Sequence, residues 1–157
     1  MDSAGERGPS AFPTLLHAAQ HAYVSALHTA LKAAGFEDLP PSGYRVAIYL
    51  AGGGTGLQEL AQRLSVSKQA TSRVVDVLVK RQYCERVSNE MDRRRATVVL
   101  TEHGRAAARE IRKAAMRLNA TIERRVEPDD IETTRRVLAT LVEAVGAALT
   151  SAGSRTR

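Results

Sequence analysis

The chain has 157 residues, a formal net charge of +6 and a pI near 10.0; its length suits one domain and its charge favours an anionic partner. Its 43% hydrophobic residues are enough for a core, which is expected to be aliphatic because only 4% of the residues are aromatic and none is Trp. A single cysteine excludes an intramolecular disulfide framework, and with neither a signal peptide nor a run of roughly 20 apolar residues for a membrane span we expect a cytoplasmic protein that contacts no membrane.

The first predicted element is a long amphipathic helix over residues 14–35. Residues 1–13 are rich in Gly, Ser and Pro, and we expect them to form a flexible segment. From Thr14 to Ala34 apolar side chains recur every three or four positions, and Gly35 can supply a left-handed C-terminal cap. The apolar stripe is wide enough to cover its own domain and a second subunit, so it predicts dimerisation.

A buried second helix is predicted between a proline-marked turn at Leu39 to Ser42 and the glycines of residues 52–54. Its apolar side chains at helical spacing are Tyr44, Val46, Ala47, Ile48 and Leu50. The glycine run lacks the lysine and hydroxyl of a phosphate-binding loop, and no strand precedes it, so it is interpreted as a connector.

Two short helices joined by a tight turn are predicted next. Apolar side chains share one face of the first helix at Leu57, Leu60, Ala61 and Leu64. The pattern breaks at Ser65 and Val66, and Ser67 can then accept the backbone N–H of Ala70 and open a second helix. The inward face of that second helix consists of Thr71, Val74, Val75 and Leu78.

The outward face of the second helix has the side chains of a DNA-reading helix. The candidate recognition residues are Ser67, Lys68, Gln69, Ser72 and Arg73. Arginine can pair with guanine, glutamine can pair with adenine, and the helix N-terminus can take a phosphate. In a helix-turn-helix such a second helix lies in the major groove. The alternative is an ordinary solvated helix face.

A β-hairpin is predicted after the helix-turn-helix. Its β-prone runs are Tyr83 to Ser88 and Ala96 to Leu100, separated by a long exposed tip at Asn89 to Arg95. Narrow minor grooves attract inserted arginines, so the candidate DNA-binding residues of this wing are Asp92, Arg93, Arg94 and Arg95. A solvated turn is the alternative. Together these elements predict a winged helix-turn-helix head over about residues 40–101, mainly α with a small β-hairpin wing (α+β).

Two further helices are predicted after the wing, over about residues 102–150. Thr101 can cap the first, and Glu127 to Asp130 marks the start of the second, because proline and acidic residues are favourable in a first turn. With the helix of residues 14–35 they would form an interlocked dimer interface. A twofold dimer matches a palindromic DNA site.

The motifs of this chain resemble those of the MarR family of bacterial transcription regulators. The resemblance covers about Leu15 to Leu149, which makes residues 14–157 a single MarR-like domain. It is carried by Leu60-Ala61 with Leu64, by Ser72 to Leu78, and by the Asp92-Arg93-Arg94 wing followed by Leu100-Thr101-Glu102-His103-Gly104. In this family a glycine usually ends the recognition helix, whereas this chain has Gln82, so a differently shaped helix exit is expected.

The resemblance implies a homodimer that binds a palindromic operator in double-stranded DNA, acts as a repressor, and is released by a small effector or an oxidant. It places Arg94 in the minor groove, with Asp92 orienting an arginine, and it implies no cofactor. An aromatic or anionic effector would lie between the dimer helices and the head. The conceivable pocket residues are Tyr23, Tyr44, Arg45, Tyr49 and His103.

Histidines and the lone cysteine offer competing hypotheses. His17 and His21 could reach one metal, but His28 is about 10 Å further along the helix and zinc needs three or four ligands, so no metal site is predicted. Cys84 is a buried hydrophobe by default, although Arg81 and Arg86 could lower its pKa and make a redox-responsive regulator.

Two other classes of function compete with a DNA-binding regulator. No sequence motif of a hydrolase, zinc protease, nucleotide-binding loop or dinucleotide-binding fold is present, so an enzyme is not expected. A winged-helix module that binds protein and not DNA remains the alternative.

Overall fold

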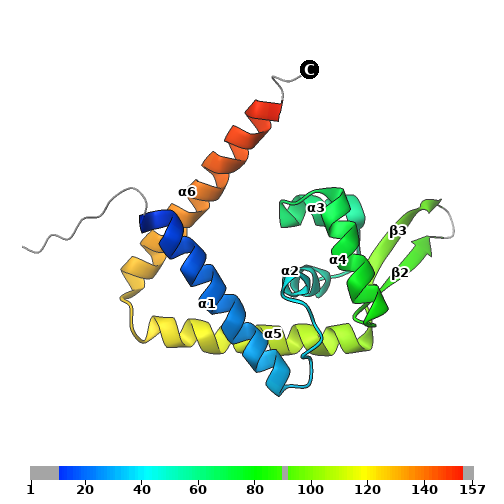
Figure 1. Ribbon diagram of the computed structural model, residues 1–157, viewed down its shortest axis with the longest axis horizontal. Coiled ribbons are helices and arrows are strands. Elements are labelled where there is room, and N and C mark those ends of the chain that lie inside the picture. Colours follow the sequence, from blue (N-terminus) through cyan, green and yellow to red (C-terminus); the bar gives the residue numbers. More distant parts are fainter. Residues whose placement is uncertain (1–10, 90–91, 154–157) are drawn as a thin grey trace, which may run out of the picture. The chain divides into compact units, whose positions relative to one another are not determined.

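The computed structural model describes residues 11–89 and 92–153 (Figure 1). Its elements in chain order are α1 (Ala11–Ala33), α2 (Pro41–Leu50), β1 (Thr55–Gly56), α3 (Leu57–Leu64), α4 (Lys68–Lys80), β2 (Cys84–Asn89), β3 (Asp92–Leu100), α5 (Glu102–Glu123) and α6 (Pro128–Gly153). The chain forms two compact units, divided within α5 between Met116 and Arg117. The predicted fold class, mainly helical with a small antiparallel sheet, is confirmed.

The first helix begins earlier than its sequence pattern predicts. Helical backbone starts at Ala11, inside the segment expected to be flexible, because Pro13 lies in the first turn, where a missing backbone N–H costs nothing. The predicted C-terminal cap is confirmed: Gly35 has a φ of 85°, and the N–H of Phe36 donates to the carbonyl of Leu31.

The core of the first unit lies where α1, α2, α3, α4 and β3 face one another. Its fully buried apolar side chains, each 0% or 1% exposed, include Leu31, Leu39, Val46, Leu60, Val75, Leu78, Tyr83 and Val98. Gly43 lets α2 approach α4 closely, because a Cβ at this position would lie 2.8 Å from Leu78 Cδ2. The predicted aliphatic core is therefore found, with Tyr44 and Tyr83 as its buried aromatic residues.

The sheet has the order β1-β3-β2 and contains one strand that the sequence pattern missed. β1 pairs antiparallel with β3 through Thr55↔Val98 and Gly56↔Thr97, directly after the glycine run. A strand of two residues has no alternation of polar and apolar side chains that a sequence could reveal. Gly54 is needed beside it, because a Cβ there would lie 2.5 Å from Val99 Cγ1.

The hairpin of β2 and β3 is longer than predicted. Its pairing continues to Asn89↔Asp92, with an irregularity between Ser88 and Asn89. The predicted length of the tip, Asn89 to Arg95, is therefore wrong, since residues 92–95 belong to β3. The register steps from Ser88↔Ala96 to Asn89↔Asp92, so the three arginines between Asp92 and Ala96 form a bulge at the end of the ladder.

Two helix exits use left-handed backbone at residues that are not glycine. Ser65 has a φ of 55° and ends α3; Gln82 has a φ of 62° and follows α4. At the second exit the N–H of Tyr83 donates to Leu78 and that of Gln82 to Val79, the bonding pattern of a Schellman cap. Gln82 thus adopts the conformation that a glycine would take, and the differently shaped exit expected here is not found.

The start of α5 is fastened to this exit. The hydroxyl of Thr101 accepts the N–H of Gly104 at 3.0 Å, which confirms the predicted cap. A Cβ at Gly104 would lie 1.9 Å from the carbonyl oxygen of Tyr83, so only glycine fits there. The first turn of α5 therefore lies directly against the backbone that leaves α4.

The second unit contains the end of α5 and all of α6. α6 begins at Pro128 with Asp129 and Asp130 in its first turn, as predicted. Ile131, Leu138 and Leu141 are half-buried. Among the residues that the structure describes, no helix is both long and apolar enough to cross a membrane.

Replacing Gln82 by glycine should stabilise the fold. The left-handed conformation costs a non-glycine residue roughly 1–2 kcal/mol, and the added freedom of the unfolded chain offsets roughly 0.5–1 kcal/mol of that cost, so a gain of about 0.5–1 kcal/mol is expected. Urea unfolding at fixed protein concentration measures it. As a control, Gln62→Gly inside α3 should destabilise by about 1 kcal/mol. If both variants lose the same free energy of unfolding, the left-handed backbone at Gln82 is not strained.

Candidate nucleic-acid interface

The second helix of the helix-turn-helix, α4, turns one face to the core and the other to solvent. Its inner residues Thr71, Val75 and Leu78 are each 0% exposed. The predicted cap is confirmed, because Ser67 Oγ accepts the N–H of Ala70 at 3.1 Å. No acidic residue lies in the first turn. The start of α4 is thus a fixed and electropositive end of the helix.

The five predicted recognition residues lie together at this end of α4. Ser67, Lys68, Gln69 and Arg73 are exposed, and Ser72 is half-buried. Among the described residues, none of the side chains of Lys68, Gln69 and Arg73 makes an ion pair or hydrogen bond. Their donors are therefore available to an external partner.

An ion pair links α4 to the hairpin. Arg86 of β2 donates to the carboxylate of Asp76 at 2.7 Å. The two side chains are 38% and 55% exposed, so the pair adds less than about 1 kcal/mol to stability. Its effect is geometric: it neutralises the acid on the outward face of α4 and aligns β2 with that helix.

The predicted wing residues are placed by backbone alone. Asp92, Arg93, Arg94 and Arg95 form the first part of β3. The side chains of residues 88–95 and all of Glu90 and Met91 lie outside the described part of the chain. The DNA contacts predicted for these arginines therefore remain predictions.

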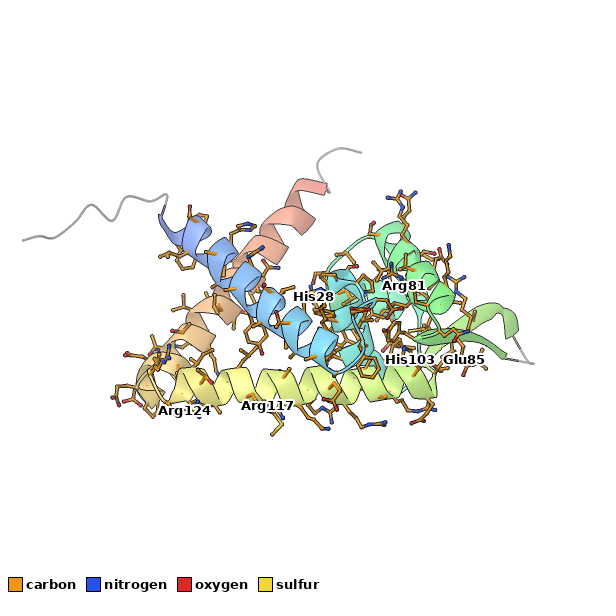
Figure 2. The ribbon with its side chains drawn as sticks, turned by 60° about the horizontal axis from the view of Figure 1, so that its bottom comes forward. His28, Arg81, Glu85, His103, Arg117 and Arg124 are labelled. Atoms are coloured by element: carbon orange, nitrogen blue, oxygen red, sulfur yellow. The ribbon has the colours of Figure 1, made fainter. Side chains whose placement is uncertain are left out.

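The end of α4 carries a cluster that sequence reasoning missed. The hydroxyl of Tyr83 donates to the carboxylate of Asp38, and the Arg81 guanidinium donates to the Asp38 carbonyl. Burial and the neighbouring Asp38 raise the pKa of the Tyr83 hydroxyl. Its ring lies 4.5 Å from the ring of His103 and 6.5 Å from that of Phe36, measured between centroids. Figure 2 labels Arg81, after α4, and His103, on α5.

This cluster joins three segments that are distant in the sequence: the α1–α2 loop, the exit of α4 and the start of α5. The only sequence signal was a tyrosine in an otherwise aromatic-poor chain. Its effect is to hold the C-terminal end of the recognition helix in place.

The residues suggested as a ligand pocket are only partly brought together. Tyr44 is 4% exposed, and its hydroxyl lies 2.7 Å from Nδ1 of His28, on α1 (Figure 2). Burial raises the pKa of that hydroxyl. Tyr23 and Tyr49 are half-buried and Arg45 is exposed, whereas His103 packs against Tyr83. Two surface hollows of the described part of the chain lie elsewhere, on α3 and the start of α4.

The structure disfavours a redox switch at Cys84. The thiol is 2% exposed, and burial raises its pKa to about 12. The default interpretation of Cys84 as a buried hydrophobe is therefore confirmed, and the alternative, a pKa lowered by Arg81 and Arg86, is not found: Arg81 is hydrogen-bonded to Asp38 and Arg86 to Asp76. Within residues 11–89 and 92–153, no three His, Cys, Asp or Glu side chains are placed to hold a metal ion.

Comparison with known family models gives a match over the head. Residues 37–95 match the family model of the MarR family. A search of the curated proteins finds no match.

Solved structures similar to this chain share its winged-helix fold. RV1404 from Mycobacterium tuberculosis is 26% identical, with a TM-score of 0.63 over 90% of this chain and 97% of that chain. FabT from Streptococcus pneumoniae, solved in complex with DNA, is 17% identical, with a TM-score of 0.77 over 90% and 99%. A MarR mutant from E. coli, complexed with operator DNA, is 22% identical, with a TM-score of 0.72 over 88% and 99%.

The Cys84 thiol should be unreactive in the folded protein. With a pKa of about 12, on the order of one thiol in ten thousand is ionised at pH 8, and the thiolate is the reactive form. Absorbance after addition of an aromatic disulfide reagent should show one fast-reacting thiol in denaturant and almost none without it. The unfolded chain is the internal control. Fast reaction of the native protein at pH 8 would restore the redox hypothesis.

Proposed function

We propose that this chain is a transcription regulator of the MarR family and that it acts as a repressor. In this proposal a homodimer binds a palindromic operator in double-stranded DNA and dissociates from it when a small effector binds. The protein would act in the cytoplasm.

The observation that carries the proposal is the two-sided construction of α4. Its inner face is fully buried, and its outer face presents Gln69 and Arg73, which have no partner among the residues that the structure describes. Arginine pairs with guanine and glutamine with adenine in the major groove. Ser67 and Lys68, at the start of the helix, would contact phosphates. FabT and the E. coli MarR mutant, which share this fold, were both solved with DNA.

The hairpin would contact the neighbouring minor groove. Arg94 is proposed to enter the groove while Asp92 orients an arginine beside it. Two observations support this: the β2–β3 pairing extends to Asn89↔Asp92, and the ion pair of Arg86 with Asp76 aligns the hairpin with the recognition helix.

A dimer is supported by exposed apolar side chains outside the head. On α1, Phe12 and Leu15 are 48% and 67% exposed; in the second unit, Val142 is 69% exposed. Helices with unburied apolar stripes of this kind fit a subunit interface better than a solvated surface. A twofold dimer would present two α4 helices to half-sites about one helical turn apart.

The effector is proposed to be a small aromatic or anionic molecule. The candidate contacts remain Tyr23, Tyr44, Arg45, Tyr49 and His103. The hydrogen bond of Tyr44 with His28 supports this choice, since it joins α1 to α2 with a polar group in an otherwise apolar contact. Binding at such a junction could alter the spacing of the two heads.

A gel-shift titration tests the proposal. Purified protein is titrated against duplex DNA from around its own gene at two salt concentrations, with unrelated duplex as competitor. Preference for one fragment, weakened steeply by salt because phosphate contacts release counterions, is the expected result. Binding that shows neither preference nor salt dependence would favour the alternative, a winged-helix module that binds protein.

Replacing Arg73 by alanine should weaken operator binding by about 1–3 kcal/mol and relax base preference at one position, because a bidentate contact to guanine is lost. Fluorescence anisotropy with operators changed one base pair at a time measures both effects. Arg112→Ala, which removes the same exposed charge from α5, is the matched control. Equal losses on every sequence would instead make Arg73 a phosphate contact.

Placing a charge at Leu15 should dissociate the dimer. An aspartate would put an unpaired carboxylate in an apolar interface, so Leu15→Asp is expected to shift the sedimentation coefficient from dimer to monomer. His21→Asp, on the polar face of the same helix, should leave the dimer intact. A dimeric Leu15→Asp protein would remove α1 from the interface.

A further inference from the structure

Two hollows meet on the outer side of the helix-turn-helix, where Figure 1 shows α3 beside α4. The first is lined by Gln58, Ala61, Gln62, Ser65, Val66, Ser67 and Lys68. The second is lined by Gly56, Leu57, Gln58, Glu59, Gln62, Lys68, Ala96 and Thr97. Gln58, Gln62 and Lys68 line both. These three side chains define what we call the amide groove.

The amide groove is presented by a firmly anchored helix. Leu60, Ala61 and Leu64 bury the inner face of α3, at 0%, 5% and 6% exposure. Gln58 and Gln62 are one turn apart, so their amides lie side by side on the outer face. Neither makes a hydrogen bond within the described part of the chain. Two exposed amides one turn apart are therefore open to a partner from outside the described part of the chain.

The acidic residue of the groove is already engaged. Glu59 accepts from Thr55 Oγ1 and from the Arg63 guanidinium, each at 2.7 Å. These hydrogen bonds and the positive charge of Arg63 lower the pKa of Glu59, so its carboxylate is ionised and paired. Within the described part of the chain Lys68 has no acidic partner, and it gives the groove a positive charge. The groove thus fits an anion with several acceptor oxygens.

We propose that Gln58 and Gln62 bind a phosphate of the DNA backbone, beside the bases that α4 reads. The inference rests on the proposed function and adds two residues that the recognition helix itself does not contain. Amide N–H groups would donate to the phosphate oxygens while Lys68 contributes the charge. The first helix of a helix-turn-helix crosses the backbone, and phosphate contacts set the register of a protein on DNA without reading sequence.

Removing the two amides should lower the affinity for DNA in a different way from removing a charged side chain. Gln58→Ala with Gln62→Ala should weaken binding on the order of ten-fold or more, equally on operator and unrelated duplex. The slope of log K against log salt should stay unchanged, because no charge is lost. Lys68→Ala should instead reduce that slope by about 1.

A gain-of-function variant tests the site independently of any loss of folding. Gln62→Lys adds a cation where the phosphate is proposed, so affinity should rise and the salt slope should steepen by about 1. Gln20→Lys adds the same charge at an exposed position of α1 and should change neither. Circular dichroism confirms the fold of each variant.

The outcomes separate this inference from the proposed function. If the unmodified protein binds DNA but the double alanine variant binds equally well, or if Gln62→Lys acts like Gln20→Lys, the groove does not hold phosphate. Relaxed base preference in the alanine variants would also overturn the inference, because it would show base reading. Failure of the unmodified protein to bind duplex DNA would overturn both.

Discussion

The burial of Tyr83 beneath the first turn of α5 is the contact on which the winged-helix head depends. Its N–H closes the cap of α4 by donating to Leu78, its carbonyl allows only a glycine at position 104, and its hydroxyl donates to Asp38. One residue, 0% exposed, thus joins the exit of the recognition helix, the start of α5 and the α1–α2 loop through its backbone and side chain. Because interiors are close-packed, none of these segments can shift without the others.

This rigid support explains how a short helix can serve as a reading surface. α4 has 13 residues, and an isolated helix of that length is marginal in water. Its side-chain cap at Ser67, the buried stripe through Val75 and the Schellman exit hold it at both ends and along its length. Because these contacts stabilise the helix, the side chains at the start of its outer face are not needed for folding and can serve to bind a ligand.

Ion pairs on the outer surface orient neighbouring elements and neutralise acidic side chains. The pairs of Asp76 with Arg86 and of Glu59 with Arg63 are exposed and contribute little stability. They do neutralise Asp76 on α4 and Glu59 on α3. A phosphate approaching α3 or α4 therefore meets cations and amides in place of uncompensated carboxylates, which favours a polyanionic partner.

The sequence by itself determined the helices, their caps and the outward residues of α4, because apolar spacing and capping are local properties that a linear pattern contains. It therefore predicted Ser67 to Arg73 as a cluster, with the Thr101 cap and the start of α6. It could not predict the two-residue β1, the pairing of Asn89 with Asp92 that lengthens the hairpin, or the junction of Asp38 with Tyr83. Nor could it show that burial, and not Arg81 or Arg86, sets the pKa of the Cys84 thiol. Those features arise from groups far apart in the chain, whose contacts and desolvation exist only once the tertiary structure brings them together.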